Sequence, residues 1–153
     1  MLVAIPFFIL LFVIAVVDLL TKKIPNYLVL FGLFYALGVA FYSVGPVSFI
    51  YSIFGFMLGL IIFSIPYVKG LIGAGDVKLA SLSGSFLGPF LLLDSILYAS
   101  IIGGGITVIY LIYKGVLHRS ISDLLRLEGG VRIPYGYAIS LGTFLSYFKP
   151  NLL

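Results

Sequence analysis

Six apolar runs, separated by short breaks that are marked by glycine, proline or charged residues, constrain the fold of this chain more than any other feature. The runs cover 2–20, 27–42, 49–68, 77–93, 95–113 and 133–148. A helix that crosses a bilayer needs about 17 to 25 mostly apolar residues, so we expect six transmembrane helices, with the fourth and sixth short for a full span. Only 9% of the 153 residues are charged, which is far below the share in soluble domains. The sequence therefore predicts an all-α polytopic membrane protein with one domain over 1–153.

The lysine and arginine residues predict how the helices are oriented. Cytoplasmic loops carry the excess of these residues, and with six helices eight of the nine fall on one side, leaving Lys149 alone on the other. We therefore expect a plasma membrane protein with both termini outside the cytoplasm. The basic residues lie between the apolar runs rather than in one cluster, so the expected partner is the bilayer and not nucleic acid. The first run has no charged segment before it and no small-residue cleavage pattern, which favours a retained helix over a signal peptide.

The longest connection between runs, at 114–132, predicts a short amphipathic helix on the cytoplasmic membrane surface. Ser120 to Asp123 has the spacing of a capping box, and the residues that follow place leucines on one face and charges on the other. We expect His118, just before this helix, to be solvated or to face lipid headgroups rather than to bind a ligand.

Two aspartates lie at the edges of apolar runs, where a carboxylate is costly unless it has a chemical role or a partner charge. Asp18 lies near the end of the first run, and Asp76 opens the fourth. The first helix is expected to run towards the cytoplasm and the fourth away from it. Both carboxylates are therefore expected at the same depth, about one helical turn inside the cytoplasmic boundary.

Two carboxylates at one depth suit general acid–base hydrolysis, in which one takes a proton from water and the other donates a proton to the scissile carbonyl oxygen. Like charges held close cannot both ionise, so such a pair shares a proton, and neither residue is assigned as the acid. The alternative for each aspartate is a helix cap or a pair with a nearby lysine. The chain has no cysteine, and its one histidine is far along the sequence from both aspartates. We therefore expect no metal, no covalent nucleophile and no cofactor.

The residues around Asp76 suggest further members of a site. Gly73 and Gly75 permit close approach of another backbone to the carboxylate, although a plain turn explains them equally well. Lys78 does not share a helix face with Asp76. It is interpreted either as an anchor at the membrane interface or as a charge that faces substrate.

Three short motifs occur in order along the whole chain. They are Asp18 followed by Lys23-Ile24-Pro25-Asn26, then Gly73-Ala74-Gly75-Asp76-Val77-Lys78, and then Ile133-Pro134-Tyr135-Gly136. This combination resembles the type IV prepilin peptidases, which are membrane aspartic proteases of the Gly-x-Gly-Asp type. A lone Gly-x-Gly-Asp would be weak, whereas three motifs in the same order are specific.

The resemblance implies a membrane aspartic endopeptidase that removes a short basic leader from pilin-like precursors at the cytoplasmic face, without a metal. It implies that Asp18 and Asp76 are catalytic. Residues that bind substrate or shape the site would be Lys23, Pro25, Asn26, Gly73, Gly75, Lys78, Pro134 and Gly136. The prolines would open backbone for a substrate strand, although a proline at the first helical position explains Pro134 equally well.

The chain departs from the bifunctional members of that family, which carry a large cytoplasmic insertion with cysteines and also methylate the product. Here the first two apolar runs are joined by a few residues, and there is no cysteine. The resemblance therefore implies cleavage without methylation, as in the short members that serve tight-adherence pili and in the compact archaeal members.

Other classes of function stay open beside the peptidase. A small transporter or proton channel would use intramembrane carboxylates to relay ions, but it favours acidic residues spread through the depth of the membrane rather than at one edge. A structural assembly subunit would tolerate loss of both carboxylates. The glycine pairs Gly55/Gly59 and Gly84/Gly88 predict close helix packing, within the chain or in a dimer, and the oligomeric state is not readable.

Overall fold

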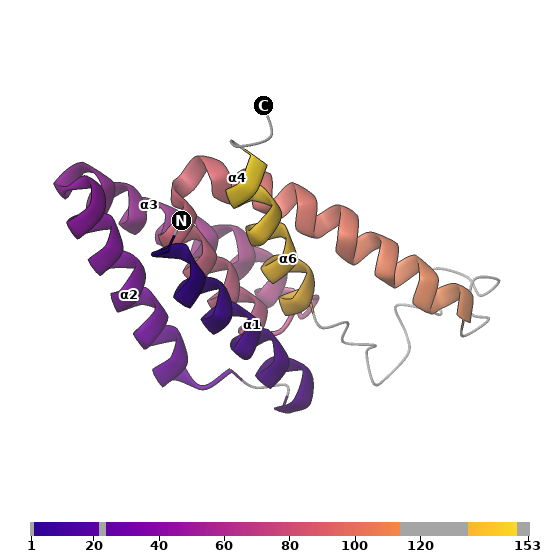
Figure 1. The fold of residues 1–153 in the computed structure, drawn as a ribbon. Coiled ribbons are helices and arrows are strands. Elements are labelled where there is room, and N and C mark those ends of the chain that lie inside the picture. The colour runs from indigo at the N-terminus through magenta and orange to yellow at the C-terminus, as the bar shows by residue number, and fades with distance from the viewer. Residues whose placement is uncertain (1, 22–23, 114–134, 150–153) are drawn as a thin grey trace.

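The structure is a computed structural model that describes residues 2–21, 24–113 and 135–149, and it is helical almost throughout this part of the chain (Figure 1). The helices are α1 (Ala4–Thr21), α2 (Asn26–Val44), α3 (Pro46–Val68), α4 (Ala74–Tyr113) and α6 (Tyr135–Phe148). No strand occurs among the described residues, which confirms the all-α prediction for them. The predicted amphipathic helix and its capping box, at 114–132, lie outside the described residues.

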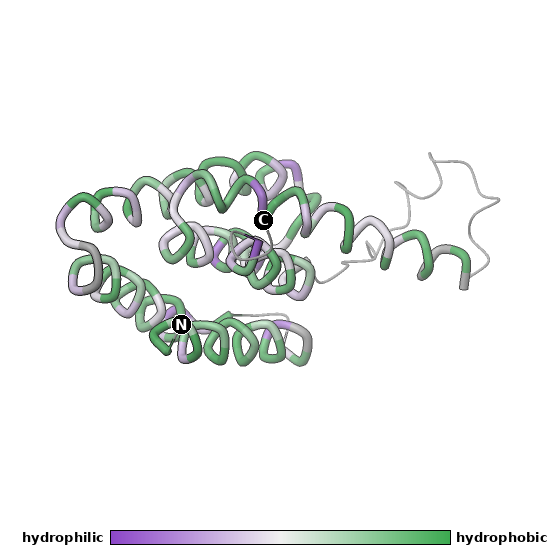
Figure 2. The backbone as a smooth tube through the Cα atoms, turned by 45° about the horizontal axis from the view of Figure 1, so that its top comes forward, coloured by the Kyte–Doolittle hydropathy of each residue, from purple (hydrophilic) through white to green (hydrophobic). Residues whose placement is uncertain are grey.

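Two of the helices, α3 and α4, are each long and apolar enough to cross a membrane, and α1 and α2 contain shorter apolar segments. Only 17% and 22% of the most apolar stretches of α3 and α4 are buried inside the fold, whereas the core helix of a soluble protein buries most of its apolar residues. Many large apolar side chains are exposed on the helices, and hydrophobic residues predominate along them (Figure 2). This surface indicates a membrane protein, and the count of six crossings stays a prediction.

The helix ends at Gly45 differ from those predicted. α2 and α3 are joined by this single residue, whose φ of 96° favours glycine, and Pro46 begins α3 where its missing N–H costs nothing. The predicted ends of the second and third runs, at 42 and 49, are therefore wrong, because both helices extend to meet at Gly45.

The predicted break between the fourth and fifth runs is also wrong. It was placed at Asp94, but α4 is helical there, and its interruption is at Gly88, which has φ 78° and ψ 174°. Pro89 follows, and its ring and missing N–H remove backbone hydrogen bonds of a continuous helix. α4 thus consists of two helical segments, 74–87 and 89–113, that meet at this kink.

Asp94 stays within the helix because it has a partner. Lys149 Nζ, just after α6, donates a hydrogen bond to Asp94 Oδ2 at 3.0 Å. This hydrogen bond, together with the charge of Asp94, raises the pKa of Lys149 above its ordinary value of 10.5. The contact joins the end of α6 to the second segment of α4.

The pKa of Lys149 predicts how the Asp94 contact depends on pH. Because the pKa is higher in the folded than in the unfolded protein, the stabilisation is complete below 10.5 and is lost as the pH rises through the folded pKa. The two side chains are 33% and 41% exposed, so we expect only a small effect. In detergent, the Tm of Lys149→Gln should be slightly lower than that of the parent at neutral pH. At a pH above the folded pKa of Lys149, the two proteins should have the same Tm. An equal difference at both pH values would contradict this origin.

α3 and α4 pack through glycines at very short range. A Cβ atom on Gly55 would collide with the backbone carbonyl of Gly84, and a Cβ on Gly84 would collide with that of Gly55. A Cβ on Gly59 would lie 2.6 Å from the carbonyl oxygen of Ala80. These three glycines therefore pack helices within the chain, which confirms one of the two predicted uses of the glycine pairs, whereas Gly88 forms the kink.

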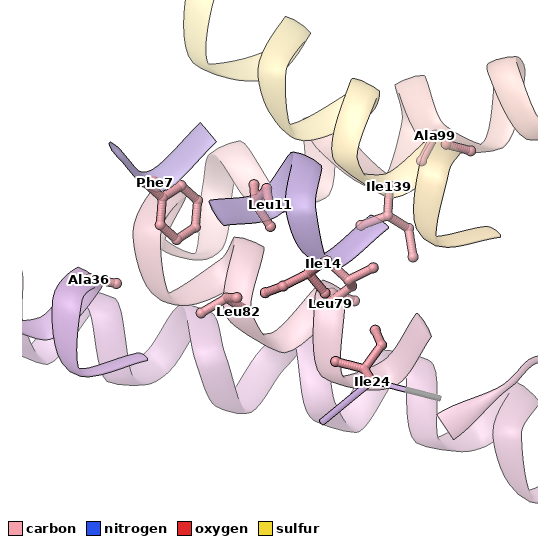
Figure 3. Close-up of a cluster of buried hydrophobic side chains, with 11 residues drawn as sticks. Phe7, Leu11, Ile14, Ile24, Ala36, Leu79, Leu82, Ala99 and Ile139 are labelled. Atoms are coloured by element: carbon pink, nitrogen blue, oxygen red, sulfur yellow. The ribbon is translucent and has the colours of Figure 1, made fainter. Parts of the chain in front are cut away.

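The buried core lies where α1, α4 and α6 meet. Figure 3 shows Leu11 and Ile14 of α1 beside Leu79 of α4 and Ile139 of α6, and Ile24 at the end of this cluster. The core also contains hydroxyl groups shared by three helical segments. They are Ser83 in the first segment of α4, Ser95 in the second and Thr143 in α6, with oxygens 2.9 and 3.2 Å from Thr143 Oγ1. These bonds fix α6 against both segments of α4 and so help to place the start of α6.

Candidate active site

Asp18 lies in the last turns of α1 and is partly buried. A Cβ atom on Gly75 would lie 2.6 Å from Asp18 Oδ1 and 3.2 Å from Ile24 Cδ1. Any side chain at position 75 would therefore push Asp18 or Ile24 away. Gly75 lets the start of α4 pass directly beside the carboxylate of α1.

Asp76 lies in the first turn of α4 and is almost fully buried, with 4% of its surface exposed. The backbone N–H of Gly73 donates to Asp76 Oδ2 at 3.1 Å, and the N–H of Asp76 donates to the carbonyl of Gly73 at 3.2 Å. These bonds hold one carboxylate oxygen in place. The other, Oδ1, is buried and accepts no hydrogen bond of normal geometry from a described residue, although Gly136 lies beside it. The turn thus fixes Asp76 and leaves Oδ1 for another partner.

The two carboxylates meet at Gly136, near the start of α6. A Cβ atom on Gly136 would lie 3.1 Å from Asp18 Oδ2, 3.6 Å from Asp76 Oδ1 and 2.8 Å from Leu79 Cδ1. Asp18 Oδ2 and Asp76 Oδ1 are therefore separated by no more than the sum of their distances from this Cβ atom. Three helices, α1, α4 and α6, each contribute one residue to this point. The glycine leaves the space in which the two carboxylates approach each other.

Lys78 joins α4 to the connection between α1 and α2. Its Nζ donates to Asn26 Oδ1 at 2.7 Å and to the backbone carbonyl of Ile24 at 3.1 Å. Ile24 is in turn buried against Gly75. Pro25, between these two acceptors, is the N-cap of α2. These bonds give Lys78 a role in holding the connection beside the carboxylates, a contact between residues more than 50 positions apart that no local pattern signalled.

Replacing Lys78 by methionine should destabilise the protein, because the Ile24 carbonyl and the Asn26 amide would both lose their charged donor. Hydrogen bonds to charged groups contribute about 1.5–3 kcal/mol each, and less where water reaches them. We expect the free energy of unfolding to fall by about 1–3 kcal/mol, measured by denaturation in detergent. Lys69→Met, at an exposed lysine at the end of α3, is the matched control. Equal stability of the two variants would show that these bonds contribute nothing.

The structure brings together most of the residues that the motifs predicted. Asp18, Gly73, Gly75, Asp76 and Gly136 form one cluster. Ile24 links it to a second cluster made of Pro25, Asn26 and Lys78, described above. Lys23 and Pro134 lie outside the described residues. Sequence reasoning missed the carbonyl of Ile24 as an acceptor and Leu79 as the side chain packed beside Gly136.

Among the described residues, no group of three or more histidine, cysteine, aspartate or glutamate side chains is close enough to hold a metal ion. The cluster offers instead two carboxylates, one buried and one partly exposed, side by side at the end of a helical core. Such a pair can divide the roles of general base and general acid towards one water molecule and one amide.

Comparison with known proteins agrees with this arrangement. The sequence model of the type IV leader peptidase family matches residues 5–108, which include both aspartates, Ile24 to Asn26 and the whole Gly73 to Lys78 segment. No curated protein and no solved structure matches the chain.

Proposed function

The chain belongs to the type IV leader peptidase family, and we propose that it is a membrane aspartic endopeptidase that cleaves the short basic leader from type IV pilin-like precursors. The family supports a peptidase, and the apolar outer surface of the helices supports a site in a membrane. The observation that carries the proposal is that Asp18 and Asp76 both lie beside Gly136. We place this site near the cytoplasmic face of the plasma membrane because of the distribution of basic residues in the sequence.

In the proposed mechanism the two aspartates share one proton. The ionised carboxylate takes a proton from a water molecule, which attacks the scissile carbonyl carbon. The protonated carboxylate donates its proton to the carbonyl oxygen, which gives a tetrahedral intermediate. The carboxyl that took the water proton then gives it to the amide nitrogen, which leaves as an amine, while the other carboxylate takes a proton back from a hydroxyl of the intermediate, so that the pair again shares one proton. Asp76 is held through Oδ2 by the N–H of Gly73, and its Oδ1 lies beside Gly136, which also borders Asp18.

Two neighbouring features support this division of labour. The glycines at positions 75 and 136 remove the side chains that would separate the carboxylates. Lys78 donates its hydrogen bonds to the Ile24 carbonyl and to Asn26 Oδ1. It therefore forms no direct ion pair with the proposed catalytic carboxylates in the described part of the chain. The dyad is therefore free to exchange protons with water and substrate.

The test is cleavage of a purified pilin-like precursor by the purified protein in liposomes, with no ion gradient across the bilayer. We expect one cut between the leader and the rest of the precursor, located by mass spectrometry of both products. Addition of EDTA should leave the rate unchanged, since the reaction needs only the two carboxylates. An intact precursor, combined with ion flux that depends on a gradient, would replace the peptidase by the transporter.

A further inference from the structure

A groove between α1 and α6 has a volume of about 400 Å³. On α1 it is lined by Phe8, Leu11, Phe12, Ala15 and Val16. These positions follow the pattern i, i+3, i+4, i+7 and i+8, so they form one continuous stripe along the helix. Leu11 and Ala15 are almost fully buried, at 1% and 2%, and form the floor of the groove.

A second stripe faces the groove from α6. It consists of Tyr137, Ser140, Leu141 and Phe144, which have the same helical spacing. Tyr137 and Phe144 are each more than 40% exposed and form its rim. The hydroxyl of Ser140 donates to the carbonyl of Gly136 at 2.9 Å, so this polar group is satisfied within α6. The groove is therefore apolar over nearly its whole length.

The two ends of the groove differ. At one end the ring of Phe8 packs edge-on against Phe144, with ring centroids 5.3 Å apart, which closes the groove. At the other end Ala15 lies one helical turn before Asp18 on the same face of α1, and Ser140 lies one turn after Gly136 on the same face of α6. Gly136 in turn borders both carboxylates. The groove thus leads along the bundle to the carboxylates.

We propose that this groove seats an apolar helix of the peptide substrate, the segment adjacent to the scissile bond. This inference rests on the proposed peptidase function. Two parallel stripes with helical spacing form a seat into which the side chains of a third helix fit. Within a bilayer a peptide satisfies its backbone hydrogen bonds by being helical. A helix in the groove ends at Asp18 and Asp76, where it must unwind to expose one amide bond.

Another cavity of the described fold offers a comparison. That cavity, of about 470 Å³, lies at the opposite end of α1 beside Ala4 and the kink at Gly88, and is lined by Tyr51. Neither lining includes a carboxylate, but no lining residue of this second cavity lies within one helical turn of Asp18, Asp76 or Gly136 along the chain. It therefore serves as the control surface for the experiment.

The experiment places a photoreactive benzoylphenylalanine at Phe12 or Phe144 in the groove, and at Tyr51 as the control. Each protein also carries Asp76→Asn so that bound precursor is not consumed. In membranes that contain the precursor, irradiation should attach the precursor at Phe12 and Phe144 and not at Tyr51. Adducts with lipid alone, adducts with a second copy of this chain, or equal attachment at Tyr51 would each overturn the groove assignment.

A kinetic comparison tests the same inference without crosslinking. Val16→Phe fills the groove, whereas Val13→Phe adds the same bulk to an exposed position of α1 that does not line it. For the full precursor, Val16→Phe should raise KM by about tenfold or more with little change in kcat, whereas Val13→Phe should not. For a precursor peptide without its apolar segment, both variants should match the parent. Equal KM values for the full precursor would overturn the assignment.

The two proposals fail in different ways. If the parent protein does not cut the precursor, the peptidase function fails and the groove assignment fails with it. If the parent cuts the precursor while Val16→Phe and the groove crosslinks show no effect, only the groove assignment fails.

Discussion

Asp18→Asn and Asp76→Asn are each expected to lower the rate of precursor cleavage by about a hundredfold or more, since general acid–base groups contribute roughly 10²–10⁴-fold. Asparagine keeps the size of the side chain and most of its hydrogen bonding but cannot exchange a proton. Because both carboxylates border the same glycine, loss of either one disables the pair. The double variant should therefore be no slower than the slower single variant, since the two groups act as a unit.

Asp94→Asn is the matched control for these substitutions. Asp94 lies in the same helix as Asp76 but is bound to Lys149, so its loss should leave cleavage near the parent rate. Each variant is compared at equal membrane abundance, measured with an antibody to a common tag. Full cleavage by Asp18→Asn or by Asp76→Asn would remove that residue from the mechanism and return attention to ion transport.

The second large effect concerns folding rather than chemistry. Gly55→Leu and Gly84→Leu should each prevent α3 and α4 from packing, because even a Cβ atom at either position collides with the backbone of the other helix. Overpacking of a core by a side chain commonly costs about 1–3 kcal/mol. Here the obstacle is backbone, which cannot rotate away, so we expect a cost above that range and little folded protein.

Gly38→Leu is the comparison for this effect. Gly38 lies in the middle of α2, and a Cβ atom there would meet nothing within 4 Å. The yield of monodisperse protein in detergent and its Tm should be near those of the parent for Gly38→Leu and strongly reduced for the other two. Normal yield and Tm for Gly84→Leu would mean that α3 and α4 do not pack as described.

The helices themselves were predictable because the length of an apolar run signals a spanning helix, and the structure places a helix on every run that it describes. The ends were less predictable. The charge of Asp94 predicts a break between two apolar runs, but in the structure the helix continues there and Asp94 is paired with Lys149, 55 residues away. Gly45 and Gly88 make the sharp turns instead, and a glycine in an apolar helix gives no sign of which φ it adopts.

The candidate site was predictable only where it depends on the order and direction of the helices. Helix direction alone predicted Asp18 and Asp76 at one depth, and in the structure both lie beside Gly136. The partner of Lys78 was not predictable, because its bonds to Ile24 and Asn26 depend on how α4 packs beside the end of α1. Contacts of this kind depend on tertiary geometry and leave no periodic pattern in the sequence.

The position of Gly136 in α6 has a consequence for biosynthesis. A ribosome makes α1 and α4 before α6. Both aspartates are therefore synthesised before Gly136, the glycine of α6 that borders them. The contacts of the Ser83 and Ser95 hydroxyls with Thr143 Oγ1 also form only after α6 has been made. The contact of Gly136 with both aspartates therefore forms only after α6 has been synthesised.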